Sequence, residues 1–179
     1  MRDLEEIPGK IQEVLDRSGQ VEKLARDMVD ATSVLFLGRH VGFPTALEGA
    51  LKLKEIAYIH AEGFAAGELK HGPIALVEEG QPVFIIVPSP RGRDSLHAKV
   101  VSNIQEVRAR GAFTLVIAEE GDTDVEPYAD VVIRYPETRT LFAPLLTIIP
   151  LQIFACELAT AKGLDVDQPR NLAKSVTVE

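Results

Sequence analysis

The sequence predicts an α/β fold in which a doubly wound, five-stranded parallel sheet is flanked by helices on both faces. Short apolar runs alternate along the chain with longer stretches of helical period, and this alternation is typical of βαβ units. The apolar runs are continuous rather than interleaved with polar residues, as expected for strands buried on both faces. In such a sheet ligands bind at the carboxyl ends of the strands, so we expect the chemistry to follow the first strand.

The first half of the chain supplies two of the five strands. An amphipathic helix is predicted over 10–30, with Ser18-Gly19 as its candidate break. A buried strand over 33–37 ends at Gly38, and Pro44 begins a helix that runs to about Tyr58. A short extended segment follows over 60–65.

The second half supplies the other three strands, over 82–87, 113–118 and 131–133. A helix is predicted over 94–110, with Asp94 as N-cap and Gly111 as C-cap. The apolar stretch 145–162 reads as a helix capped by Gly163, and Pro150 should kink or restart it.

Length and charge narrow the functional class. The 179 residues fit one domain, and the formal net charge of −8 argues against non-specific binding of nucleic acid. An acidic protein can still carry a local site for an anionic ligand.

The single cysteine, Cys156, cannot form an internal disulfide, so the composition predicts a cytoplasmic protein. The first six residues are largely acidic and Pro8-Gly9 follows, which does not fit a signal peptide. The apolar stretch 141–161 contains Pro150 and Glu157 and favours a buried helix or a subunit interface over a membrane span.

No motif for a cofactor or metal is recognised. Gly38-Arg39-His40-Val41-Gly42 lacks the pattern of a dinucleotide loop, and no phosphate-binding P-loop sequence occurs. No spacing of His, Cys and Asp suggests a metal site. Cys156 lies in an apolar helix and is better explained as a core residue than as a nucleophile.

Charged residues concentrate on the helix predicted after the first strand. Glu48, Lys52 and Glu55 are spaced i, i+4 and i+7, so they share one helix face, whereas Lys54 points away from it. Two interpretations stay open from spacing alone. The stripe is either a salt bridge on a solvated face or a set of groups for acid–base chemistry.

A glycine-punctuated loop over 66–73 follows the extended segment and is rich in charge. Loops at strand ends often carry function, and His71 can gain or lose a proton near neutral pH. The alternative for His71 is a turn residue bonded to backbone.

Three long motifs carry a family resemblance: 38–39 with 44–55, then 66–73, and finally 165–179. In this order and without gaps, they resemble the glucosamine-6-phosphate synthase family, the isomerising glutamine:fructose-6-phosphate amidotransferases. The resemblance covers essentially the whole chain and corresponds to the second of two SIS (sugar isomerase) modules, with a flavodoxin-like fold. We therefore predict an N-terminal helical segment over 1–30, an SIS domain over 31–164 and an active-site tail over 165–179.

The resemblance implies a role for each matching residue. Glu55 would be the base that moves a proton between C1 and C2 of the open-chain sugar. Lys52 would act at the C1 hydroxyl, and Glu48 would support Lys52. His71 would assist ring opening from a neighbouring subunit of a homodimer, and Lys174 would contact or form an imine with the ketose carbonyl. The alternative to a catalytic role is that Lys174 is a mobile lysine near the chain terminus.

The resemblance also implies partners. The substrate and product would be fructose 6-phosphate and glucosamine 6-phosphate, with no cofactor, nucleic acid or membrane involved. The family's glutaminase domain and first SIS module, whose Ser/Thr-rich loop grips the phosphate, have no counterpart here, so we expect the isolated chain to be a weak or inactive catalyst. The alternatives are a non-catalytic regulatory module that binds a phosphosugar and a structural dimerisation half.

Overall fold

The computed structural model describes residues 2–91 and 96–172. Its five-stranded sheet has the order β2-β1-β3-β4-β5, and every neighbouring pair is parallel. This confirms the predicted fold class, and the order is that of flavodoxin-like sheets. The strands are β1 (Ser33–Gly38), β2 (His60–Ala65), β3 (Pro82–Ile86), β4 (Phe113–Glu119) and β5 (Val131–Tyr135).

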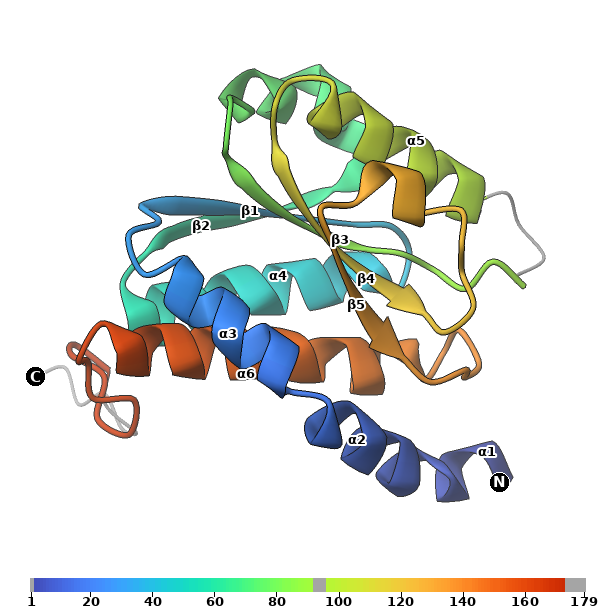
Figure 1. Ribbon diagram of the computed structural model, residues 1–179, viewed down its shortest axis with the longest axis horizontal. Helices are drawn as coiled ribbons and strands as arrows, with labels where there is room; N and C mark the ends of the chain where they lie inside the picture. Colours follow the sequence, from blue (N-terminus) through green and yellow to red (C-terminus); the bar gives the residue numbers. More distant parts are fainter. Residues whose placement is uncertain (1, 92–95, 173–179) are drawn as a thin grey trace, which may run out of the picture.

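Helices cover both faces of the sheet (Figure 1). One face carries α2 (Ile7–Asp16), α3 (Gly19–Asp27), α4 (Gly42–Lys52) and α6 (Ala143–Ala161). The other carries α5 (Leu96–Arg108) with the 3₁₀ turns η2 (Ala66–His71), η3 (Pro73–Leu76) and η4 (Glu126–Tyr128). The short helix α1 (Arg2–Glu5) precedes α2.

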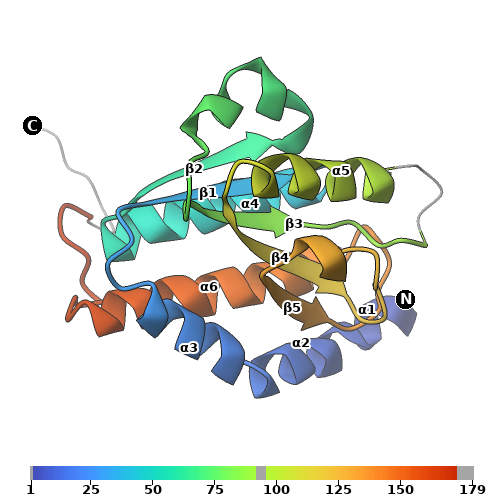
Figure 2. The same ribbon diagram turned by 45° about the horizontal axis from the view of Figure 1, so that its top comes forward.

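The N-terminal helices break where the sequence indicates, between α2 and α3 at Ser18. Both pack along α6, as Figure 2 shows from a second angle. The division of the chain at residues 30 and 164 stays a prediction.

Aromatic residues join the sheet to α6. The rings of Phe36 on β1 and Phe84 on β3 stack at 5.1 Å between centroids, and Phe154 of α6 meets Phe84 edge-on at 4.9 Å. All three side chains are fully buried. Burying one such side chain stabilises a fold by about 1.5–3 kcal/mol, so this aromatic group fixes α6 on the sheet.

Helix α6 runs without interruption through Pro150, which is buried. The expected restart at this residue is wrong, because packing against the core holds the helix although proline removes one backbone hydrogen bond. By length and composition α6 could cross a membrane, and half of its apolar window is buried inside the domain.

Glycines end two helices as predicted. After α5, the N–H of Gly111 donates to Arg108 O and the N–H of Ala112 donates to Val107 O, with Gly111 at φ +85°. After α6, the N–H of Gly163 donates to Thr160 O and the N–H of Leu164 donates to Ala159 O, with Gly163 at φ +71°. This is the Schellman arrangement, which favours glycine. The predicted N-cap of α5, Asp94, lies outside the described residues.

The helix predicted over 44–58 differs from the observed one at its end. After α4 the backbone widens into a π turn, η1 (Leu53–Ala57), which Tyr58 ends in the left-handed conformation at φ +55°. The N–H of Tyr58 donates to Leu53 O, five residues back. Short π segments frequently occur at functional sites, and this one contains Glu55.

Candidate active site

The charged stripe on α4 and η1 is brought together as predicted. Lys52 Nζ lies 2.5 Å from Glu55 Oε2 and 3.5 Å from Glu48 Oε1. The side chains of Lys52, Glu55 and Glu48 are 29%, 27% and 39% exposed, so they form neither a buried cluster nor a fully solvated face. The ammonium is therefore held between two carboxylates at the edge of the domain.

The hydrogen bond to Glu55 raises the pKa of Lys52, partial burial opposes the rise, and the charges of Glu55 and Glu48 add to it. Lys52 consequently remains charged at neutral pH. A charged ammonium can donate hydrogen bonds to an oxygen that gains negative charge during a reaction.

Glu55 lines a cavity of about 540 Å³. The cavity is formed by two segments far apart in the sequence: Lys54, Glu55, Tyr58, Ile59 and His60 from one, and Arg170, Asn171 and Leu172 from the other. It lies at the amino end of β2, because α4 runs back from the carboxyl end of β1. The Glu55 cavity follows the first strand in the sequence but does not lie at the carboxyl ends of the strands, where ligands of such sheets usually bind.

The cavity includes two residues that the sequence analysis missed. The backbone N–H of Arg170 donates to Tyr58 Oη at 2.8 Å, and the Arg170 guanidinium lies 4.1 Å from the centroid of the Tyr58 ring. Periodicity carries no signal for a contact between residues so far apart in the chain. The motif 165–179 pointed to the tail but not to the place where it docks.

His71 lies elsewhere. It ends η2, its side chain is 73% exposed, and its Nδ1 lies 2.9 Å from Glu68 Oε2. Leu69 of the same turn is buried in the core on the α5 side of the sheet, whereas α4 packs on the opposite side. A single chain therefore does not bring His71 to Glu55.

Lys174 falls outside the described residues. The described tail ends at Leu172, in the wall of the Glu55 cavity.

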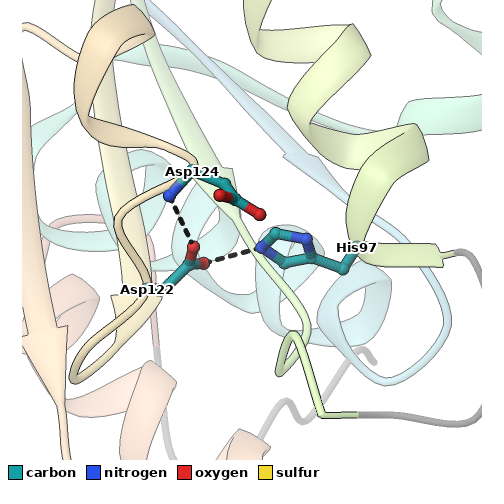
Figure 3. Close-up of side chains that lie close together, drawn as sticks. All are labelled: His97, Asp122 and Asp124. Atoms are coloured by element: carbon teal, nitrogen blue, oxygen red, sulfur yellow. Dashed lines mark hydrogen bonds and ion pairs between the residues drawn. The ribbon is translucent and has the colours of Figure 1, made fainter.

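A second group of chemically capable side chains lies near the N-terminus of α5 (Figure 3). One potential ligand atom each from His97, Asp122 and Asp124 lies within 4.8 Å of the others. His97 Nε2 is 2.8 Å from Asp122 Oδ2, both residues are buried, and Asp124 is exposed. Because the two buried groups already satisfy each other, we assign the pair to joining α5 with the loop after β4.

A larger cavity, of about 950 Å³, lies beyond the carboxyl ends of β3 and β5. Its arginines are paired with acids: Arg91 with Glu119 and Glu137, and Arg139 with Asp3. In the Glu55 cavity, by contrast, Lys54 and Arg170 have no ion-pair partner among the described residues. The smaller cavity is thus the better candidate for an anionic ligand.

Comparison with known proteins identifies relatives along the whole chain. The family model described as SIS domain matches residues 27–162. Relatives named glutamine–fructose-6-phosphate aminotransferase (isomerizing) include one from Corynebacterium efficiens, 77% identical over 98% of this chain, and one from Streptomyces coelicolor, 68% identical over all of it. The chain spans 28% and 29% of the length of these two relatives.

Solved structures share the fold. The C-terminal domain of glucosamine-fructose-6-phosphate aminotransferase from Francisella tularensis is 37% identical with a TM-score of 0.84, over 93% of this chain and 46% of that one. Tagatose-6-phosphate ketose/aldose isomerase from Escherichia coli, 20% identical with a TM-score of 0.75 over 88% of this chain and 43% of that one, shows the shared fold alone. The match over residues 27–162 establishes that the chain belongs to the SIS domain family.

Proposed function

We propose that this chain is the sugar-isomerising module of a glutamine–fructose-6-phosphate aminotransferase, which converts fructose 6-phosphate and ammonia to glucosamine 6-phosphate. The observation that carries the proposal is Lys52, held between Glu48 and Glu55 where Glu55 lines a cavity. The names of the close relatives support the choice of reaction.

The reaction needs a base that moves a proton from C1 to C2. After ring opening, ammonia adds at the C2 carbonyl and water leaves, giving an imine. Glu55 then takes the proton from C1 and returns it to C2, while Lys52 hydrogen-bonds the C1 oxygen. Glu48 keeps the Lys52 ammonium beside Glu55. Isomerisation in this form requires no metal ion or organic cofactor.

The charge of the cavity supports a phosphorylated substrate. Lys54 and Arg170 line it, against the single carboxylate of Glu55. A positive site of this kind on a chain of net charge −8 favours anions locally.

Lys174 completes the proposed site. The described tail ends at Leu172, which lines the Glu55 cavity, and Lys174 lies outside the described residues. Its proposed role, to contact the ketose carbonyl or form an imine with it, rests on the family resemblance of the motif 165–179 and on the chemistry of an amine beside a carbonyl.

The remaining partners follow from the position of His71 and from the longer relatives. His71 lies on the other side of the sheet from Glu55, so we propose that it acts on a neighbouring subunit of a cytoplasmic homodimer. A first SIS module supplies further contacts to the phosphate, beyond the cationic groups of the Glu55 cavity, and a glutaminase domain supplies ammonia.

Proton exchange tests the base directly. In an intact enzyme that contains this chain, sugar phosphate incubated in D₂O should gain deuterium at the carbon that Glu55 deprotonates, and Glu55→Gln should slow this exchange by roughly 10²–10⁴-fold. Glu62→Gln, on the nearby β2 edge, is the matched control and should exchange normally. Unchanged exchange in Glu55→Gln would refute the role of Glu55. Sugar binding without any exchange in the unmodified protein would favour the regulatory module instead.

Complementation tests the role of His71. Mixed dimers of His71→Ala and Glu55→Ala chains should recover activity, because one of the two sites then has both residues intact. A mixed dimer as inactive as its parents would contradict catalysis across the subunit interface.

A further inference from the structure

We propose that Tyr58 is a positioning residue that docks the C-terminal tail beside Glu55. This inference deepens the proposed function, because it says how the tail reaches the site. It rests on the contact of Tyr58 with Arg170, on the backbone that fixes Tyr58, and on the cavity that both residues share with Glu55.

Tyr58 holds the tail at two points. Its ring face receives the Arg170 guanidinium at 4.1 Å, and its hydroxyl oxygen accepts the Arg170 backbone N–H at 2.8 Å. The first contact is a cation–π interaction with the side chain, and the second fixes the main chain. Together they set both the position and the orientation of the tail.

Tyr58 is itself fixed to the segment that carries Glu55. Its backbone N–H donates to Leu53 O, and Ala57 and Ile59 on either side are buried. Tyr58 and Glu55 lie three positions apart in the sequence, at the end of η1. A tail that docks on Tyr58 is thereby placed relative to the Glu55 carboxylate.

The tail is shaped to meet the ring. Asn171 adopts the left-handed conformation at φ +62°, and the Leu172 N–H lies 3.4 Å from Pro169 O. Asparagine accepts this conformation more readily than most residues. The turn brings Arg170, Asn171 and Leu172 into the wall of the cavity.

The contact is suited to positioning rather than to stabilising the whole domain. Arg170 is exposed and Tyr58 is only partly buried, so losing the contact should release the tail without unfolding the sheet. An exposed cation–π pair and one neutral hydrogen bond each change an equilibrium by roughly twofold to tenfold.

Amide hydrogen exchange measured by NMR on the 179-residue chain tests docking without relying on catalysis. Tyr58→Phe keeps the ring and should reduce protection of the Arg170 amide by roughly threefold to tenfold. Tyr58→Leu should reduce it further and abolish the ring-current shift of the Arg170 side chain. Tyr128→Phe, on η4, should change neither. Unchanged Arg170 signals in Tyr58→Leu would overturn the proposal.

Kinetics of an intact enzyme containing this chain tests the consequence. Tyr58→Leu should lower kcat for isomerisation by roughly tenfold or more while leaving glutamine hydrolysis intact, and Tyr58→Phe should recover part of the loss. Normal kcat in a Tyr58→Leu enzyme whose tail is undocked by NMR would also overturn the positioning role. If instead the Glu55→Gln enzyme retains full deuterium exchange into the sugar phosphate, the proposed function fails while the docking result is unaffected.

Discussion

Gly38, the last residue of β1, lies directly against the backbone of the first turn of α4. A Cβ built on Gly38 would lie 2.1 Å from Gly42 O, 2.3 Å from Gly42 C and 2.7 Å from Phe43 N. All three atoms are backbone, so no side chain can rotate to make room. The substitution Gly38→Ala must therefore move the start of the helix that carries Glu48 and Lys52.

The size of the effect follows from these distances. Real Cβ contacts essentially never fall below 3.0 Å, so the Gly42 carbonyl must shift by at least 3.0 − 2.1 = 0.9 Å. Overpacking usually costs about 1–3 kcal/mol, and a backbone clash belongs at or above the top of that range. Replacing glycine by alanine in a strand recovers about 0.5–1 kcal/mol of entropy. We expect a net loss of about 2 kcal/mol or more.

Urea unfolding followed by circular dichroism measures this loss. The matched control is Gly9→Ala in α2, where a Cβ meets nothing within 4 Å and helix propensity should stabilise the protein by up to about 1 kcal/mol. If Gly38→Ala unfolds within about 0.5 kcal/mol of the parent at an unchanged m-value, the argument from close approach is refuted.

Three further substitutions test the packing of the core, the loss of stability at alkaline pH and the role of Lys52. Phe154→Ala should cost about 3–5 kcal/mol in urea unfolding, since it removes a fully buried ring that packs on Phe84; a loss below about 1 kcal/mol would contradict the assigned packing. Burial and the nearby Glu119 and Asp122 raise the pKa of Tyr135 from its usual 10.0, so the unfolded chain ionises first and stability should fall above that pH by up to about 1.4 kcal/mol per unit. Tyr135→Phe should flatten this fall in unfolding measured from about pH 9 to about pH 11, and an equal slope would argue against it. Lys52→Met should lower kcat for sugar isomerisation by roughly 10²-fold or more yet change the unfolding free energy by at most about 1 kcal/mol, because the ion pairs are partly exposed; loss of stability in step with activity would point to a structural role.

The fold was predictable because each local signal agrees with the final packing. The run over 82–87 is buried along β3 as its continuous apolar character indicates, and Gly111 and Gly163 stand where the helices need a left-handed residue. The predicted restart at Pro150 was wrong because a local rule about proline does not include the core contacts that hold α6.

Contacts of the site were predictable between residues close together in the sequence, but not between residues far apart in it. Helical spacing alone placed Glu48, Lys52 and Glu55 on one face, and the ion pairs of Lys52 confirm that geometry. The contact of Tyr58 with Arg170 depends on how the tail folds back over the domain, which no periodic pattern encodes. The roles of these residues, and of His71 and Lys174, stay predictions.

The π turn lets the chain between α4 and β2 hold an extra residue without changing the direction in which it leaves the helix. Leu53–Ala57 accommodates one residue more than a continuing α-helix would. Deleting a single residue there would let the α-helix run on, and Tyr58 would keep its orientation toward Arg170. The same deletion within α4 would rotate all that follows by about 100° and turn the Tyr58 ring away from Arg170. Single-residue deletions should thus be better tolerated in this turn than in the helix before it.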